Sequence, residues 1–331
     1  MEDRPVGIED PAVRHALTAW GIDPVSWEYA PVGFGDYHWT ATDTHERRWF
    51  VTVADLAHKS WYGDGPDAAL RGLRDAMDTA VALRDAQPHG LDFVVAPLRT
   101  ADGETVRALG TGHAVSVFPL VQGTPGHFGE TCTAHERGLV LDLLARLHRT
   151  PPPVSARVLP PEFATRPQLE AALRETGSPW DGIGPYADPA RQLVADHVVA
   201  LRGRLDEFDL RAAELRDSDA HLVVTHGEPH PGNLLRAGER RLLLDWDTVG
   251  LAVPERDLWL VAGGPDDLAR YEGATGRQPD PSALALYRLR WALNDVAEFL
   301  GLFRAPHVRT PDTDQAWKAL TGTVEGLAAE A

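Results

Sequence analysis

The sequence predicts an α+β protein of two lobes: a small N-terminal lobe with an antiparallel sheet and one main helix, and a larger, mostly helical C-terminal lobe. The chain has 331 residues, which is long for a single core. Its hydrophobic fraction of 43%, with 10 Trp, is enough to build sizeable cores. Strand-like alternation gives way to helical spacing near residue 121, so we expect lobes at 1–121 and 122–331.

The first lobe is expected to start with a short helix within residues 1–24. From Trp27 to Asp55, aromatic and β-branched residues alternate around a glycine turn (GFG) and a polar turn (DTHERR), which is typical of a hairpin. Apolar residues in 66–86 recur at helical spacing. The runs FVVAPL and HAVSVFPLVQG predict two further strands around the turn TADGE.

The second lobe is expected to be mainly helical. Amphipathic spacing predicts helices over 136–151, 189–215 and 281–303, the first ended by a run of three prolines. The segments HLVVTHGEPHPGNLL and RRLLLDWDTVG read as short strands that bound a loop rich in Pro and Gly. Residues 150–188, also rich in Pro and Gly, give the least predictable pattern.

Charge and cysteine content exclude several classes of partner and site. With 49 acidic and 32 basic residues, the net charge of -17 would repel nucleic acid and anionic membranes. It permits cationic ligands, and it equally fits an acidic surface that favours solubility. The single cysteine, Cys132, allows no intrachain disulfide and no Cys-based zinc site. No apolar run approaches the ~20 residues that span a bilayer, so we expect a cytoplasmic protein.

The most informative segment is THGEPHPGN, which is followed by DWD. Glu228 lies five residues before Asn233 on a loop stiffened by two prolines, and Asp245 and Asp247 follow an apolar strand. Carboxylate and amide oxygens suit Mg²⁺, and a carboxylate can orient or deprotonate a hydroxyl group. Such a set favours phosphoryl transfer, although Asp245 and Asp247 could instead cap a turn.

The run HGEPHPGNLL followed by LLLDWD resembles the catalytic and metal loops of aminoglycoside phosphotransferases and choline kinases, which carry His-Gly-Asp, four residues and then Asn. The later run PERDLWLVAGG resembles spectinomycin phosphotransferases in particular. The resemblance implies a protein-kinase-like fold with a nucleotide-binding first lobe, a catalytic and substrate-binding second lobe, and Mg²⁺ with ATP or GTP as cofactors.

The same resemblance implies roles for individual residues. Asn233, Asp245 and Asp247 would bind Mg²⁺, and Glu228 would occupy the position of the catalytic base. His226 would buttress the loop and Asp257 would hold it from the following helix. A zinc pair of His226 and His230 is disfavoured, because Pro229 and Pro231 forbid the helix that i, i+4 ligation needs. On the nucleotide side the resemblance implies contacts from Gly33, Gly35, Phe50, Thr52, Phe118 and Leu120.

Two positions depart from the family pattern. Glu228 stands where the family has Asp, and one methylene shifts a carboxylate by more than ~1 Å, which costs roughly a hundredfold if nothing compensates. Thr52 stands where the third strand of kinases carries a Lys, and no Glu lies between Glu46 and Glu104 to pair with one. Candidates for the replacement cation are Lys59, Arg71 and Arg74. Gly33 and Gly35 could be a purely structural turn, and Phe50 an ordinary core aromatic.

The acceptor is expected to be a hydroxylated small molecule, and a cationic one if the acidic residues Glu255, Asp295 and Glu298 meet it. A solvated helix face explains these three residues equally well. The resulting hypothesis is an O-phosphotransferase that acts on an antibiotic or related metabolite and confers antibiotic resistance. The alternatives are a catalytically impaired pseudokinase that binds nucleotide or ligand, motivated by Thr52 and Glu228, and an atypical nucleotidyl transferase.

Overall fold

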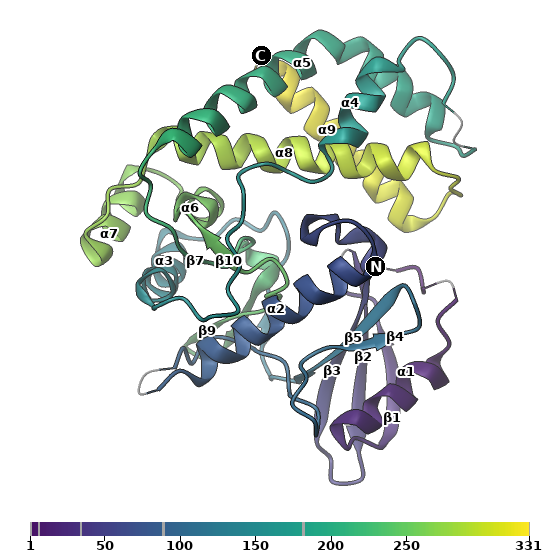
Figure 1. Cartoon of the computed structure of the whole chain (residues 1–331), viewed down its shortest axis with the longest axis vertical. Coiled ribbons are helices and arrows are strands. Elements are labelled where there is room, and N and C mark those ends of the chain that lie inside the picture. Colours follow the sequence, from purple (N-terminus) through teal and green to yellow (C-terminus); the bar gives the residue numbers. More distant parts are fainter. Residues whose placement is uncertain (1, 6, 34, 88–89, 181–182, 331) are drawn as a thin grey trace. The chain divides into compact units, whose positions relative to one another are not determined.

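A computed structural model describes residues 2–5, 7–33, 35–87, 90–180 and 183–330. The chain divides into two compact units. Apart from the first two residues, one unit comprises Asp3–Leu159 and His221–Asp280, and the other comprises Pro160–Ala220 and Pro281–Ala331. The predicted α+β class is confirmed, with an antiparallel sheet early in the chain and helices later (Figure 1). The division of roles at residue 121 stays a prediction.

An antiparallel five-stranded sheet organises the first part of unit one, in the order β1-β2-β3-β5-β4. Its strands are β1 (Pro24–Ala30), β2 (Asp36–Asp43), β3 (Arg48–Asp55), β4 (Arg107–Leu109) and β5 (His113–Pro119). The expected hairpin between Trp27 and Asp55 is therefore present, with β2 pairing both β1 and β3. Phe34, in its glycine turn, lies outside the described residues.

The two faces of this sheet have different partners. On one face, Trp39, Val51 and Val115 are buried in a cluster with residues of α1 (Asp10–Ala16) and η1 (Leu17–Trp20). Successive residues of a strand point to opposite faces. The other face therefore carries the alternate residues, among them the cross-strand partners His38, Thr52 and Ser116.

A short connection and one long helix follow β3. Two 3-10 turns, η2 (Leu56–His58) and η3 (Ser60–Tyr62), lead into α2 (Pro66–Asp85), and the long helix confirms the prediction for 66–86. Pro66 at the first position suits a helix start, because the missing N–H has no partner there anyway.

The expectation that FVVAPL forms a strand is wrong. These residues, 93–98, belong to no strand. Val94 forms one parallel bridge with Leu243, and Leu98 donates its amide to Val117 at 2.7 Å. The segment divides its hydrogen bonds between β5 and the later β9, so neither pairing extends into a ladder. A strand that the sequence did not indicate, β4, pairs with β5 instead.

The remainder of unit one carries the loops of interest. After β6 (Thr124–Pro125) and α3 (Ala134–Arg149), the chain returns at His221 to form short strands and two helices. These are β7 (Val223–Thr225), η4 (Pro231–Asn233), β8 (Leu234–Ala237), β9 (Arg240–Leu243), β10 (Gly250–Ala252), α6 (Glu255–Val261) and α7 (Pro265–Thr275).

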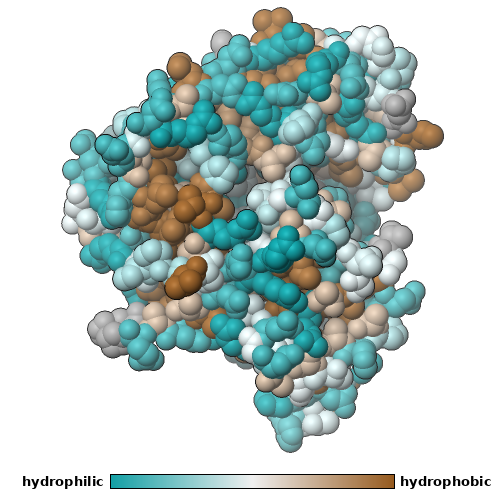
Figure 2. Space-filling model, viewed as in Figure 1, coloured by the Kyte–Doolittle hydropathy of each residue, from teal (hydrophilic) through white to brown (hydrophobic). Residues whose placement is uncertain are grey.

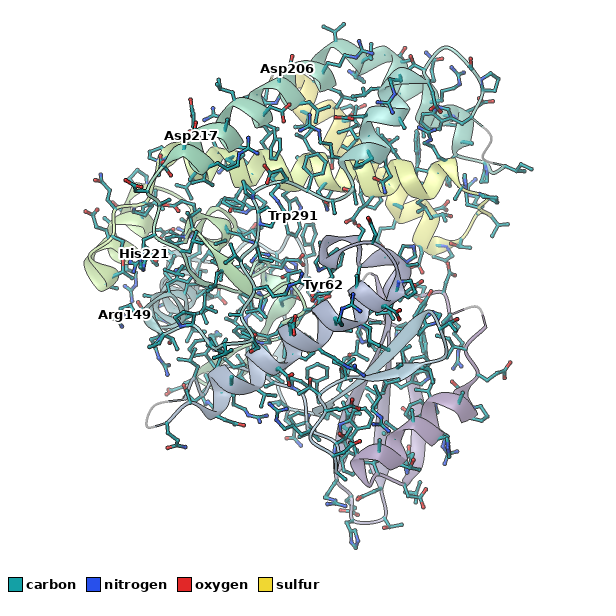
Figure 3. The ribbon with its side chains drawn as sticks, viewed as in Figure 1. Tyr62, Arg149, Asp206, Asp217, His221 and Trp291 are labelled. Atoms are coloured by element: carbon teal, nitrogen blue, oxygen red, sulfur yellow. The ribbon has the colours of Figure 1, made fainter. Side chains whose placement is uncertain are left out.

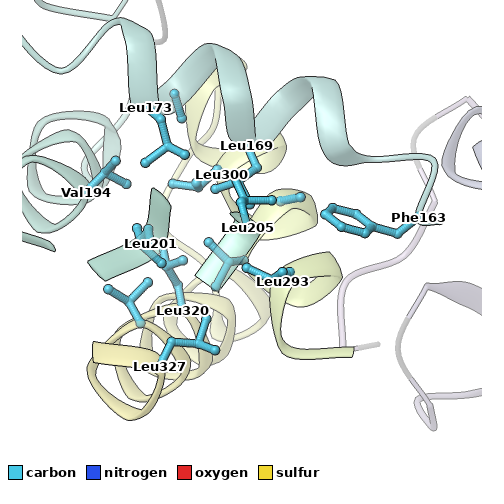
Figure 4. Packing of buried hydrophobic residues seen from close by; sticks show 14 of the residues in the cluster. Phe163, Leu169, Leu173, Val194, Leu201, Leu205, Leu293, Leu300, Leu320 and Leu327 are labelled. Carbon is cyan, nitrogen blue, oxygen red and sulfur yellow. The ribbon is translucent and has the colours of Figure 1, made fainter. Parts of the chain in front are cut away.

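Unit two is helical, with α4 (Arg166–Arg174), α5 (Ala187–Asp217), α8 (Pro281–Arg304) and α9 (Pro311–Ala329). Its core is built from Leu, Phe and Val side chains of all four helices and the segment before α4 (Figure 4). The predicted helices over 189–215 and 281–303 are confirmed as α5 and α8. The face in Figure 2 is mostly hydrophilic, and none of the helices in the described ranges is long and apolar enough to cross a membrane.

Candidate active site

The loop after β7 is bound through its backbone to Asp257, on α6. The carboxylate is fully buried and accepts the amide hydrogens of His226 (2.8 Å) and Gly227 (2.6 Å). His148 of α3 approaches the same carboxylate with Nε2 at 3.0 Å. Burial opposes ionisation, but His148 and the charge of Arg256 outweigh it and hold the pKa of Asp257 below its usual value. Hydrogen bonds to an ionised group are the stronger kind, so the loop is tied firmly to α6.

Gly227 cannot be replaced without moving this loop. Its φ is 101°, in the region that favours glycine. A Cβ atom placed there would lie 2.3 Å from Nη2 of Arg256, whose guanidinium donates to Thr225 Oγ1 at 2.8 Å and to the Thr248 carbonyl at 2.9 Å. The Gly of the motif is therefore required by close packing against Arg256.

His226 is neutral and structural. Its Nε2 lies 2.8 Å from the carbonyl of Leu244 and carries the proton, while Nδ1 accepts the amide hydrogen of Glu228 at 3.2 Å. Burial lowers the pKa of His226, which keeps this arrangement. Since both ring nitrogens have hydrogen-bond partners, His226 is not a zinc ligand. The buttress role implied by the resemblance fits this geometry.

Asn233 and Asp245 bring oxygen donors to this loop. Asn233 donates its side-chain amide to the carbonyl of Glu228 at 3.0 Å, which turns the nitrogen inward and makes the oxygen the side that can ligate a cation. The backbone of Asn233 also accepts the Leu244 amide at 2.9 Å, so the two loops are joined. Asp245 has a φ of 58°, a conformation that non-glycine residues adopt mainly where the surroundings impose it.

Negative charge accumulates around Asp245. The residue keeps access to solvent, yet the protein packed around its carboxyl group and the charges of Asp247 and Glu228 raise its pKa well above the usual value. A divalent cation would relieve this repulsion, and the donors are the hard oxygens that Mg²⁺ takes. The residues present therefore fit a magnesium site. Within the described ranges no three His, Cys, Asp or Glu side chains form a metal-binding group, so the amide of Asn233 and nucleotide phosphates would have to complete it.

Asp247 is paired with Lys59. The Nζ atom lies 2.6 Å from Asp247 and 3.1 Å from Asp36, and its side chain is only 5% exposed. Burial alone would lower the pKa of Lys59, but the two carboxylates outweigh it and raise that pKa well above its usual value. Tyr62, labelled in Figure 3, donates its hydroxyl to the backbone carbonyl of Asp247. The metal role assigned to Asp247 stays a prediction, because its carboxylate already has this partner.

Glu228 lies on the solvent-accessible side of the loop. Its side chain is 33% exposed, and Oε2 is 3.9 Å from Nε2 of His230. Burial, with the nearby His226, lowers the pKa of His230 to about 4, so His230 is neutral near pH 7. The backbone of Glu228 is fixed at both ends, by His226 Nδ1 and by Asn233. The carboxylate thus stands on a fixed backbone and is accessible to solvent.

The nucleotide-side residues predicted from sequence share one face of the sheet. Phe50 and Thr52 are two residues apart on β3 and so lie on the same face, and Phe118 is the cross-strand partner of Phe50 on β5. His38 of β2 stacks on Phe50 with ring centroids 4.9 Å apart and places Nδ1 3.2 Å from Thr52 Oγ1. Phe50 lies on the face of the sheet opposite the core cluster. It is therefore not one of the core aromatic residues of that cluster, which was the alternative to a nucleotide contact.

The other predicted nucleotide contacts have backbone features of note. Gly33 and Gly35 have φ values of 70° and 103°, which suit a tight glycine turn. The amide of Leu120 donates to the carbonyl of Arg48 at 3.1 Å. The nucleotide roles of Gly33, Gly35 and Leu120 stay predictions.

The predicted acceptor residues are placed apart in the chain's two units. Glu255, in unit one, is 5% exposed and accepts the amide hydrogen of Asp280 at 2.7 Å, and burial raises its pKa. It is therefore not part of a solvated helix face. Asp295 and Glu298 lie on α8 in unit two, where Asn294 donates to Glu298 at 2.9 Å. Their roles toward an acceptor stay predictions.

Several residues of this site had no clear signal in the sequence. His38, Asp36 and Tyr62 lie far along the chain from the DWD motif, and only the fold brings Asp36 and Tyr62 to Asp247. Of the three candidate cations, Lys59 is the one paired with Asp247, whereas Arg74 pairs with Glu104 at 3.4 Å. The scarcity of lysine, two residues against thirty arginines, was the available signal for Lys59.

A family model described as the phosphotransferase enzyme family matches residues 27–291. Protein StrN of Streptomyces griseus is 31% identical over 246 residues, which are 70% of this chain and 72% of StrN.

Solved structures share the fold. Spectinomycin phosphotransferase APH(9)-Ia, in complex with ADP and spectinomycin, superposes with a TM-score of 0.71 at 16% identity, covering 98% of both chains. Amicoumacin kinase hAmiN, in complex with AMP-PNP, Ca²⁺ and Ami, gives a TM-score of 0.63 at 15% identity over 98% of this chain and 94% of that one. At such identities these likenesses show the kinase-like fold.

Proposed function

Because the chain belongs to the phosphotransferase enzyme family and is a small-molecule kinase, we propose that it transfers the γ-phosphoryl group of ATP or GTP to a hydroxyl group of a small molecule. The observation that carries the proposal is the joined pair of loops that presents Glu228, Asn233 and Asp245 together in one unit. Phosphoryl transfer depends mainly on positioning and on stabilising charge, and these loops offer both.

Each residue of this set has a part in the reaction. Asn233 and Asp245 would hold Mg²⁺, which when bound neutralises charge on the nucleotide phosphates. Glu228 would accept the proton of the acceptor hydroxyl as its oxygen attacks the γ-phosphorus, while the bond to the bridging oxygen of the nucleoside diphosphate breaks. Asp257 and His226 keep the loop in place through the hydrogen bonds already described.

We expect a hydroxylated, cationic acceptor of the antibiotic type. The net charge of -17 and the acidic residues Asp295 and Glu298 favour a basic ligand. Proteins of the same fold are kinases of spectinomycin and of amicoumacin, so basic antibiotics form the first panel to test. A cationic ligand should bind more weakly as salt rises; equal thermal shifts for neutral and cationic analogues, insensitive to salt, would count against this acceptor class.

Labelled nucleotide separates the candidate reactions. The parent protein is incubated with the acceptor panel, Mg²⁺ and ATP or GTP labelled at either the γ- or the α-phosphorus. Appearance of γ-label in an acceptor supports the kinase, and α-label in the product shows a nucleotidyl transferase. A pseudokinase would bind nucleotide but transfer no label to any acceptor of the panel. In that case the double variant Glu228→Asp with Thr52→Lys would gain transfer activity.

A further inference from the structure

The third-strand position where kinases carry a lysine is closed to a cation in this protein. Thr52 occupies it, and its hydroxyl oxygen lies 3.2 Å from Nδ1 of His38. His38 in turn stacks on Phe50 and comes within 3.3 Å of where a Cβ on Gly33 would stand. A neutral, packed cluster therefore fills this part of the sheet face, and a phosphate-binding charge must come from elsewhere.

Lys59 is a buried cation beside both the glycine turn and the loop that carries Asp245. It follows β3 by four residues and places Nζ between Asp36, which opens β2 directly after the glycine turn, and Asp247, two residues after Asp245. The ammonium group thus joins the glycine turn to the loop with the candidate magnesium ligands. A third-strand lysine paired with a helix carboxylate would make a comparable link between phosphates and scaffold.

The position is built around the ammonium group. Lys59 is 4% exposed, and Nζ lies 5.1 Å from the centroid of the Trp61 ring. Tyr62 anchors the segment to the Asp247 backbone, and its ring packs where a side chain on Gly72 would stand, 2.3 Å from a Cβ there. The chain has thirty arginines and one other lysine, Lys318 on α9. The buried Lys59 supplies a compact point charge, which an arginine would not.

Lys59 has two carboxyl partners, because Asp36 and Asp247 both face its single ammonium group. Two of the three N–H donors of Lys59 are directed at carboxylates among the described residues, and the third can meet a phosphate oxygen.

We propose that Lys59 is the cation that contacts the nucleotide phosphates, relocated from β3 to the turn before α2, with Asp36 and Asp247 as its carboxylate partners. This inference rests on the proposed nucleotide-dependent function.

Calorimetry on the whole protein tests it with two probes that differ in phosphate. The probes are a non-hydrolysable ATP or GTP analogue with Mg²⁺ and the corresponding nucleoside, measured on the parent, Lys59→Met and the matched control Lys318→Met. Losing a hydrogen bond to a charged group weakens binding roughly 10- to 100-fold. We expect that loss for the analogue in Lys59→Met only, with nucleoside affinity within about threefold of the parent in every protein.

The outcomes separate this inference from the proposed function. A parent protein that binds no analogue overturns both, whereas a parent that binds it and a Lys59→Met variant of equal affinity overturn only the role of Lys59. Equal loss of nucleoside and analogue shows a structural lysine and also overturns it. If Lys59→Met does not fold, the double variant Lys59→Met with Asp36→Asn removes one of the carboxylates left without a partner. The same phosphate-specific loss of affinity is expected for it. Failure of both variants to fold would show a structural role for Lys59 and overturn the inference.

Discussion

Glu228 is one methylene longer than the Asp of the families that this chain resembles, and the loop around it is rigid. Its amide is bound by His226 and its carbonyl by Asn233, and Pro229 and Pro231 restrict the backbone that follows it. A longer side chain on a fixed backbone can reach a hydroxyl only if that hydroxyl lies correspondingly farther away. We therefore regard Glu228 as matched to its site.

Removing this carboxylate should abolish catalysis and spare nucleotide binding. Glu228→Gln is expected to lower kcat about 10²- to 10⁴-fold, the usual contribution of a general base. Glu228→Asp should also lower kcat, because the shorter carboxylate no longer reaches. Nucleotide affinity, measured by calorimetry, should stay close to that of the parent, as should the activity of the exposed control Glu239→Gln. A Glu228→Gln protein as active as the parent would show that Glu228 is not the base.

His38 should make stability depend on acid pH. Burial is the main reason that the pKa of His38 falls to about 3, against about 6.5 when unfolded. Between pH 6.5 and 3, His38 is protonated in the unfolded chain but neutral in the folded protein. The free energy of unfolding therefore falls as pH drops from 6.5 toward 3.

The effect is measured as unfolding free energy against pH, by urea denaturation from pH 7 to 5. His38→Gln should flatten the slope by up to about 1.4 kcal/mol per pH unit, the limit for one proton. The exposed His221 (Figure 3) gives the control His221→Gln, which should follow the parent. Parallel curves for the parent and His38→Gln would refute the assignment of a neutral, buried His38.

At the scale of elements, the catalytic loop is shaped by α6 and by β7 paired with β10. Helix α6 supplies both Asp257, which binds the loop amides, and Arg256, against which Gly227 packs. The helix is short, yet most of its residues are buried. Its buried side chains thus fix the position of the loop.

Gly227→Ala tests this packing. The new methyl group would meet the guanidinium of Arg256 and the residue would be held at a φ of 101°, so we expect destabilisation by about 1–3 kcal/mol together with a fall in kcat. Gly273→Ala, on α7 with no atom within 4 Å of the new Cβ, is the matched control. It should be neutral or stabilising by about 0.5–1 kcal/mol. Equal melting temperatures for Gly227→Ala and the parent would contradict the close approach.

The elements that the sequence predicted well are those with a strong local period. The alternation in β2 and β3 and the helical spacing in α2, α5 and α8 fix these elements wherever they pack. The run FVVAPL has the composition of a strand but divides its hydrogen bonds between Leu243 and Val117. The local sequence pattern does not indicate which partner a segment will pair with. The site follows the same rule: the motif residues were found, but the pairing of Lys59 with Asp247, 188 residues away, depends on tertiary structure.

At the scale of the molecule, the two units differ in what they offer. Unit one contains the sheet, the candidate catalytic loop and the candidate metal donors. Unit two is a helical body with its own core, and it carries the acidic pair Asp295 and Glu298.

Calorimetry on Asp245→Asn tests the proposed magnesium site of unit one most directly. Asn tolerates the left-handed conformation that Asp245 adopts, so the fold should be unchanged. A non-hydrolysable nucleotide analogue is titrated with Mg²⁺ and again with EDTA, with Asp266→Asn, exposed at the start of α7, as the control. We expect Mg²⁺ to strengthen binding to the parent and the control and to have no effect on Asp245→Asn, whereas an undiminished Mg²⁺ effect in Asp245→Asn would refute the site.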